Sequence, residues 1–329
     1  MIETHPTARR LLARALARGR LAHAYLFAGP EGAGKRTLAR EFAAALVCGQ
    51  GAFPPCRECG PCKRALAGSH PDVMIVEPEG KNIKIDSIRG LTSRLNLHSF
   101  EGGRKVGIVV TAELMNEHSQ NAFLKTLEEP PADTVLIMTA ANLNRLLPTI
   151  ISRCQVMRVP AMPDSVIIEL LKIERGLTGN EALLVAALSG GNARKALDMD
   201  LEFVVEFRKD MVRRLLSLDP ADRIAILQFA EAMEKVARDQ PVDDIFDLLI
   251  AFYRDVLHLR LGHDRIANQD LRAEAMGQAD AGPPDTVLDK METITRARNR
   301  AAGNANLKLN WEILTMALAG VEGAEISPP

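Results

Sequence analysis

Residues 23–40 read HAYLFAGPEGAGKRTLAR, and this stretch decides the fold of the first half of the chain. A short apolar run at 24–28 predicts a buried strand, and apolar residues at helical spacing predict a helix over 36–47. Between them, Gly29, Gly32, Gly34 and Lys35 fit the pattern G-x-x-x-x-G-K. Such a loop binds phosphate through its backbone N–H groups and the helix N-terminus, and the lysine meets the β- and γ-phosphates. A chance glycine turn explains less, because strand, loop and helix follow in the required order.

The residue after the loop lysine departs from an active ATPase. A Ser or Thr hydroxyl normally binds magnesium there, but the chain has Arg36. A guanidinium group has no acceptor atom and cannot bind a cation. Thr37 lies about 100° further round the helix, so we do not expect it to substitute. ATP or ADP is therefore expected to bind without a well-placed magnesium ion.

The acids that should follow a neighbouring strand are also missing. An ATPase of this class needs acidic residues there to organise magnesium and activate water. The apolar run 106–110 is the candidate strand, and Val110 and Thr111 stand where the acids are expected. Glu113 comes two residues later and is expected to be a solvated side chain. Both departures predict a site that does not hydrolyse nucleotide at a useful rate.

The order of predicted elements indicates an α/β domain followed by an all-helical part. Further strands are predicted at 72–76, 134–139 and 155–159, with a helix from Asp86 to 95 and another begun by Asn116 and ended by Pro130 and Pro131. This alternation predicts a mostly parallel sheet covered by helices on both faces. No strand is predicted after residue 164. Short helices to about 199 are followed by a loop-rich segment at 262–284 and longer helices at 201–217, 221–238, 242–261, 285–302 and 308–319.

Composition bounds the class of protein. The 329 residues suggest two or three domains, and 47% hydrophobic residues suffice for real cores. The net charge of −1 and the single Trp argue against a disordered nucleic-acid tail or an aromatic platform for single strands. No apolar run approaches the roughly 18 residues of a membrane span. The Arg-rich start is expected to be an amphipathic helix rather than a transit peptide, with Leu11, Leu12, Ala15 and Leu16 facing inward, and the chain is expected to be cytoplasmic.

Four of the five cysteines form a compact motif. Cys48, Cys56, Cys59 and Cys62 read C-x7-C-x2-C-x2-C. Four thiolates satisfy a tetrahedral Zn²⁺ ion, and a cytosolic cluster favours metal over disulfides. A redox pair and an iron–sulfur cluster are the alternatives, although the spacing differs from that of ferredoxins. We therefore expect structural zinc with no open coordination position.

Several motifs together resemble the clamp-loader branch of the AAA+ family, the subunits of the bacterial DNA polymerase III clamp loader. They are NAFLKTLEEPP (121–131), NRLLPTIISRC (144–154), the cysteine insertion (48–62), GGNARKAL (190–197) and NANLKLNWEIL (304–314), and the resemblance covers essentially the whole chain. It implies a RecA-like AAA+ domain over 1–162, a small helical lid over 163–203 and an all-helical collar over 204–329. Through the collar, such subunits assemble into a pentameric ring.

The resemblance also implies roles for individual residues. Ser152, Arg153 and Cys154 match a Ser-Arg-Cys motif that supplies an arginine to the ATP site of the neighbouring subunit. Arg194 matches the lid arginine that senses nucleotide, and Thr139 matches the sensor position at a strand end. The plain alternatives are a surface arginine beside a buried cysteine, a helix-surface cation, and a strand terminus bonded to backbone.

The residues predict a site that does not hydrolyse ATP, and the resemblance implies a ring member that carries no polymerase chemistry. Its expected partners are the gamma, tau and delta subunits, the sliding clamp, and primer–template DNA within the complex, with no membrane. One rival is an active ATPase like gamma. The other is a zinc-dependent DNA-binding protein with a relict ATPase core, for which Arg57, Lys63 and Arg64 would supply the charge.

Overall fold

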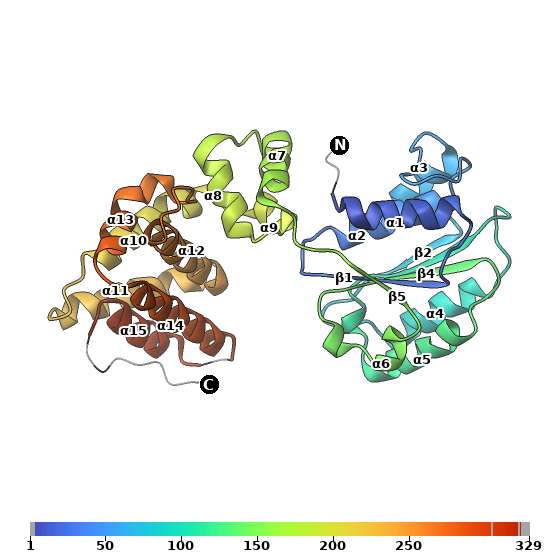
Figure 1. The fold of residues 1–329 in the computed structure, drawn as a ribbon. Helices are drawn as coiled ribbons and strands as arrows, with labels where there is room; N and C mark the ends of the chain where they lie inside the picture. Colours follow the sequence, from blue (N-terminus) through green and yellow to red (C-terminus); the bar gives the residue numbers. More distant parts are fainter. Residues whose placement is uncertain (1–3, 304, 322, 324–329) are drawn as a thin grey trace. The chain divides into compact units, whose positions relative to one another are not determined.

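The structure is a computed structural model that describes residues 4–303, 305–321 and 323. The chain divides into two compact units, which are drawn in Figure 1 and described separately below. The first unit comprises residues 1–166 with 191–194, and the second comprises 167–190 with 195–329. None of the helices in the described part of the chain is long and apolar enough to cross a membrane.

A five-stranded parallel sheet forms the centre of the first unit. Its strands lie in the order β2-β3-β4-β1-β5, and every neighbouring pair is parallel. The bounds are β1 Ala24–Ala28, β2 Val73–Val76, β3 Lys105–Val109, β4 Thr134–Ala140 and β5 Gln155–Arg158. All five strands lie within one residue of the predicted ranges, so the α/β fold class is confirmed.

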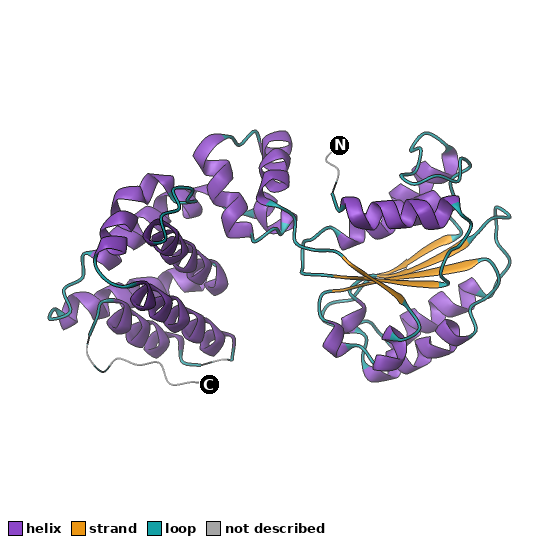
Figure 2. Cartoon of the chain, in the orientation of Figure 1, coloured by secondary structure: helices purple, strands orange, loops and turns teal. Residues whose placement is uncertain are grey.

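Helices cover both faces of this sheet, as Figure 2 shows. On β1, Tyr25 and Phe27 belong to the core beneath α1 and α2, while Leu26 belongs to the core beneath α4 and α5. Successive side chains of a strand point to opposite faces, which explains why these fully apolar strands serve two cores. The helices of the first unit are α1 Pro6–Ala17, α2 Lys35–Leu46, α3 Gly60–Ala67, α4 Ile85–Leu95, α5 Glu117–Glu128 and α6 Pro148–Ile151, with short turns η1 Ala112–Leu114 and η2 Leu143–Arg145.

Local details correct parts of the helix predictions. Asn116 does cap α5, since its side-chain oxygen accepts a hydrogen bond from the N–H of Ser119. Asp86, in contrast, lies inside the first turn of α4, which begins after Lys84. There its charge still favours the helix N-terminus. The helix α3 inside the cysteine insertion was not predicted, because the glycines and prolines of that segment hide a helical pattern.

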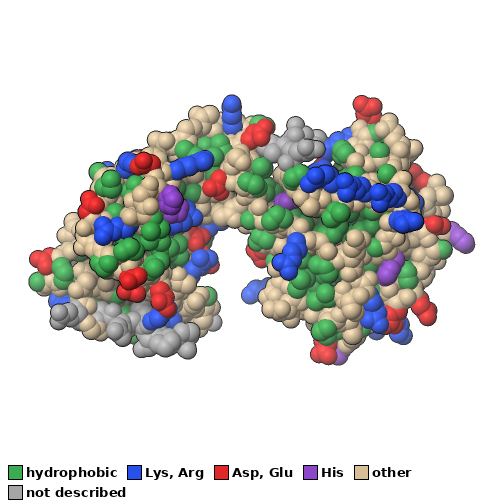
Figure 3. All heavy atoms as spheres, in the orientation of Figure 1, with side chains coloured by type: hydrophobic (Ala, Val, Ile, Leu, Met, Phe, Trp, Pro, Cys, Tyr) green, Lys and Arg blue, Asp and Glu red, His purple; other side chains and the backbone are tan. Residues whose placement is uncertain are grey.

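The first helix has a narrower buried face than predicted. Leu12 and Leu16 are buried, but the side chain of Leu11 is half exposed at 49%. The opposite side carries a row of basic side chains that is visible over α1 in Figure 3. Its exposed members are Arg10, Arg14 and Arg18. The amphipathic character of the helix is confirmed.

The second unit is helical throughout the residues that are described. Two of its helices, α7 Asp164–Arg175 and α9 Ala193–Asp198, begin with residues of the first unit. The others are α8 Gly179–Ser189, the π-helical turn η3 Phe203–Phe207, α10 Arg208–Leu216, α11 Arg223–Asp239, α12 Val242–Arg260, η4 Gln269–Leu271, α13 Arg272–Asp280, α14 Pro284–Ala302 and α15 Leu307–Leu318. The segment 262–284, predicted to be loop-rich, thus contains α13. The division of this part into a lid over 163–203 and a collar over 204–329 stays a prediction.

Candidate functional site

The loop between β1 and α2 has the shape of a phosphate-binding loop. Gly32 and Gly34 have φ angles of 66° and 84°, which a side chain would strain. Lys35 is the first residue of α2, and its Nζ donates to the carbonyl oxygens of Gly29 and Pro30, both at 2.6 Å. The ammonium thus lies over the loop, at the carboxyl end of β1, where open parallel sheets bind ligands.

Two other segments lie against this loop. His5, just before α1, is buried, and its Nε2 donates to the carbonyl of Ala33 at 2.5 Å. Burial lowers the pKa of His5, although the hydrogen bond to Ala33 opposes this. On another side, the N–H of Ala193 donates to the carbonyl of Gly32 at 3.3 Å. The start of α9 therefore lies beside the phosphate loop, and the sensor role of the exposed Arg194 stays a prediction.

The magnesium-binding position is occupied by an ion-paired arginine. The guanidinium of Arg36 lies 2.5 Å from Glu77, the residue that directly follows β2. Arg40, one turn further along α2, lies 3.5 Å from the same carboxylate. Thr37 is exposed on the outer side of the helix. Residue 36 is thus directed toward a carboxylate and presents no oxygen to a cation.

Glu113 was predicted to be a solvated side chain, and this prediction is wrong. Its side chain is only 6% exposed, and its Oε1 accepts a hydrogen bond from the N–H of Ala141 at 2.7 Å. Its Oε2 has no hydrogen-bond partner among the described residues. Burial lowers the pKa of Lys35, and the nearby Glu113 opposes this lowering. A buried acid, Glu113, therefore does lie near Lys35. It lies beyond the end of β3, where the sequence predicted that acids would be needed.

Thr139 ties two neighbouring strand ends together. Its side chain is buried, and its hydroxyl oxygen accepts a hydrogen bond from the N–H of Thr111 at 2.9 Å. A strand terminus bonded to backbone was the alternative to a sensor role for Thr139, and this contact is such a bond. It also brings Thr111, the residue at the expected acid position, to the carboxyl edge of β4.

The Ser-Arg-Cys motif presents an arginine on the surface. The guanidinium of Arg153 lies 2.8 Å from Glu128 at the end of α5, and it donates to the carbonyl of Thr149 at 3.0 Å. Ser152 donates to the same carbonyl at 3.1 Å. Cys154 is partly buried, and burial raises the pKa of its thiol to about 12. The thiol therefore stays protonated and packs against the core beneath α4 and α5, while Arg153 stays accessible from outside.

The four cysteines of the insertion meet in one place. Their sulfur atoms all lie within 4.8 Å of one another. The Sγ atoms of Cys48 and Cys56 are 3.6 Å apart, and those of Cys56 and Cys62 are 3.7 Å apart. With metal–sulfur bonds of about 2.3 Å, the edge of a tetrahedral zinc tetrathiolate is about 3.8 Å. The arrangement can therefore hold a tetrahedral metal ion with little movement.

Backbone N–H groups point at these sulfur atoms. The N–H groups of Gln50, Cys59 and Cys62 donate to the sulfurs of Cys48, Cys56 and Cys59 at 3.4–3.5 Å. The contacts from Cys62 lower the pKa of Cys59 to about 6. Because metals bind thiolates, donors placed in this way favour the metal-binding form.

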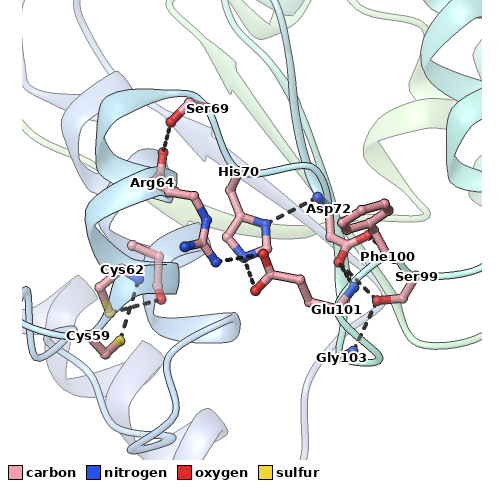
Figure 4. Close-up of polar contacts among 11 residues, drawn as sticks. Cys59, Cys62, Arg64, Ser69, His70, Asp72, Ser99, Phe100, Glu101 and Gly103 are labelled. Atoms are coloured by element: carbon pink, nitrogen blue, oxygen red, sulfur yellow. Dashed lines mark hydrogen bonds and ion pairs between the residues drawn. The ribbon is translucent and has the colours of Figure 1, made fainter.

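A chain of polar contacts joins the insertion to the start of β2, as Figure 4 shows. Arg64 of α3 pairs with Glu101 at 2.6 Å, and Glu101 faces Nε2 of the buried His70 at 3.5 Å. Nδ1 of His70 accepts from the N–H of Asp72, so the proton is on Nε2. The Asp72 carboxylate in turn accepts from Ser99, Phe100 and Glu101. The insertion is thus fixed to the sheet on this side.

A buried carboxylate that the sequence analysis missed fixes the insertion on its other side. Glu41 of α2 is 5% exposed, and its two oxygens pair with Arg9 of α1 and Arg57 of the insertion. Arg9 also donates to the carbonyl of Thr4, next to His5. Glu41 therefore links the phosphate-loop helix, the first helix and the cysteine insertion.

Comparison with known proteins gives long matches. The family model described as DNA polymerase III, delta subunit, matches residues 4–163. The DNA polymerase III subunit delta′ of Bacillus subtilis is 30% identical, covering 97% of each chain. That of Pseudomonas aeruginosa is 34% identical, covering 98% of this chain and 99% of the relative. The DNA polymerase III subunit tau of Bacillus subtilis is 30% identical, covering 72% of this chain and 43% of its own.

Proposed function

The chain belongs to the delta′ family of DNA polymerase III subunits, and on that premise we propose that it is a ring member of the clamp loader that does not hydrolyse ATP and completes the ATP site of a neighbour. Its partners are the gamma or tau subunits and the delta subunit in a pentameric ring. Together they load the sliding clamp onto primer–template DNA in the cytoplasm.

The observation that carries this proposal is the Arg36–Glu77 pair at the position of the magnesium ligand. A guanidinium group has no acceptor atom and cannot bind magnesium, and the positive charge of Arg36 opposes a second cation nearby. The loop itself, with Lys35 and the N-terminus of α2, still suits phosphate. Nucleotide binding without turnover follows from this combination.

Arg153 supports the second half of the proposal. A guanidinium that belonged to the chain's own site would not need to be solvent-accessible, yet Arg153 lies on the surface beside α5. An arginine supplied from one subunit to another stabilises charge that spreads over the γ-phosphate oxygens in the transition state. Burial of Cys154 and the hydrogen bond of Ser152 to Thr149 fix the backbone from which Arg153 extends.

The cysteine cluster is assigned to structural zinc held by Cys48, Cys56, Cys59 and Cys62. A full set of four sulfurs leaves no open position for substrate, so the ion would supply folding energy and no chemistry. The rival of a DNA-binding zinc module is weakened by the charges around it. Arg57 is paired with Glu41 and Arg64 with Glu101, so two of the three cations considered for DNA are already engaged.

ATP turnover by the purified chain tests the proposal directly. With ATP and magnesium, we expect nucleotide to bind and hydrolysis to stay at background. Arg36→Thr should also leave hydrolysis at background, because a hydroxyl at 36 still lacks the acids at 110 and 111. The buried Glu113 near Lys35 favours the rival of an active ATPase. Brisk turnover that disappears in Glu113→Gln would establish that rival.

Metal content tests the cysteine assignment. The purified chain is expected to contain one zinc ion per chain by elemental analysis. Cys62→Ser should lower this to near zero, because three thiolates and a hydroxyl bind zinc far more weakly. Cys154→Ser is the matched control and should keep the zinc, since Cys154 lies outside the cluster. Iron in place of zinc, or equal metal loss in both variants, would contradict the assignment.

A further inference from the structure

A small cavity at the start of α14 has no role in the proposed function. It lies where α14 packs against α12, two helices that run side by side in Figure 1. Its volume is about 140 Å³. An engineered protein cavity of about 150 Å³ holds a benzene molecule. A cavity of this volume therefore has room for a small ion. The side chains and backbone that matter are those of Tyr253, Gln278, Gly282, Pro283, Thr286 and Lys290.

Tyr253 lines this cavity and carries a buried hydroxyl. The residue is 1% exposed, and its OH has no hydrogen-bond partner in the described part of the chain. A buried hydroxyl without a partner costs free energy and calls for an explanation. Burial raises the pKa of Tyr253, so the hydroxyl keeps its proton and is able to donate. A ligand that accepts hydrogen bonds would satisfy it.

Lys290 brings a positive charge without a counter-charge. Its Nζ lies 5.4 Å from the centre of the Tyr253 ring and 3.2 Å from the side-chain oxygen of Gln278. Among the described residues, its ammonium forms no ion pair with a carboxylate. Burial lowers the pKa of Lys290, and no neighbouring acid opposes this. A partly buried ammonium group that has no carboxylate to replace its lost hydration is unusual.

The N-terminus of α14 adds to the same charge. The helix has 19 residues and begins at Pro284, so its first turn carries a partial positive charge, although Pro284 has no N–H and the N–H of Thr286 donates to the carbonyl of Pro283. Thr286, in that turn, and the preceding Gly282 and Pro283 line the cavity. The exposed Asp285 belongs to the same turn but does not line the cavity. Every ionisable group that faces the cavity is thus a cation or a hydroxyl donor.

We propose that this cavity binds a small oxyanion of the phosphate class, held by Lys290, Tyr253 and the first turn of α14. The ammonium supplies a charge-assisted hydrogen bond and the tyrosine a neutral one, while Thr286 offers a further hydroxyl at the rim. The anion would satisfy the hydroxyl of Tyr253 and neutralise the ammonium in one step. Such a site makes the stability of the helical unit depend on phosphate, independently of the nucleotide loop.

The test compares the full chain in phosphate and in chloride at equal ionic strength. Phosphate is expected to raise the Tm of the helical unit by roughly 2–6 °C in the unaltered chain. Lys290→Met should abolish this gain, and Tyr253→Phe should weaken phosphate binding by about fivefold, the effect of one hydrogen bond. Lys235→Met removes an exposed lysine of α11 and is the matched control, so it should keep the gain. Glycerol phosphate in a parallel arm distinguishes an ester from the free ion.

Two outcomes would overturn the site. An equal gain in all four proteins would mean that phosphate acts through the solvent or through the loop at Lys35, and not through this cavity. A ¹³C NMR titration of Lys290 in the unaltered chain gives a second measurement that does not depend on any variant folding. Bound phosphate should raise the Lys290 pKa relative to chloride, because the anion favours the charged form. An unchanged pKa at saturating phosphate would contradict the proposal.

Discussion

Replacing Arg153 by alanine is expected to lower ATP hydrolysis at the neighbouring subunit's site by about 10³-fold or more, the contribution of an arginine supplied to a γ-phosphate. Nucleotide binding by the altered chain should not change, because Arg153 contacts Glu128 and Thr149 and not the loop around Lys35. The measurement is single-site turnover in an assembled loader whose other ATPase subunits carry inactivated phosphate loops. Without that precaution, turnover elsewhere in the ring would hide the loss.

The ion pair with Glu128 does not prevent Arg153 from reaching a partner. Both side chains are more than a third exposed, and exposed pairs contribute only about 0–1 kcal/mol. A bidentate contact with phosphate is stronger than such a pair and fixes the planar guanidinium. Glu128 therefore orients Arg153 in the isolated chain, and little free energy is lost when Arg153 leaves it for a partner's phosphate.

Two further variants separate charge from geometry. Arg153→Lys keeps the charge but loses the fork of donors, so most of the rate should still be lost. Arg145→Ala removes an exposed arginine from η2 and should leave turnover unchanged. Full activity of the loader with Arg153→Ala, at normal assembly, would remove the basis for a role in the neighbour's site.

The sequence predicted features that depend on local order along the chain. The strand, the glycine loop and the helix after it are contiguous, and the last three cysteines of the cluster are three residues apart, so their geometry follows from spacing. Glu113 could not be placed in this way, because its burial depends on the N–H of Ala141, 28 residues later in the chain. Leu11 could not be placed either, because helical periodicity shows which side of the helix is buried but not how wide the buried face is.

Glu41 did leave a signal in the sequence that was overlooked. Leu38, Glu41, Phe42 and Ala45 recur at helical spacing, so Glu41 lies on the buried face of α2. A carboxylate on a buried face needs a cation, and Arg9 and Arg57 are drawn from 32 residues before and 16 residues after it. The need for partners was predictable, whereas their identity required the fold.

Glu41→Ala is expected to destabilise the first unit by about 3–5 kcal/mol, because it leaves a guanidinium buried without its counter-charge. Arg9 is the critical partner, since its side chain is only 14% exposed. For a unit of this size the change corresponds to a fall in Tm of roughly 6–20 °C. Glu129→Ala, which removes an exposed acid at the end of α5, is the control and should stay within about 0.5 kcal/mol. A loss below 1 kcal/mol for Glu41→Ala would show that the two pairs are already solvated.

The two arginines should respond differently to the metal. Arg57 directly follows Cys56, one of the proposed zinc ligands, whereas Arg9 belongs to α1, so we expect only the position of Arg57 to depend on the metal. Double-mutant cycles should therefore give a coupling energy between Glu41 and Arg57 that disappears when the metal is chelated. The coupling between Glu41 and Arg9 should persist. Equal couplings with and without metal would mean that the Glu101–His70 contacts alone hold the insertion in place, and zinc would then be unnecessary for linking it to the phosphate-loop helix.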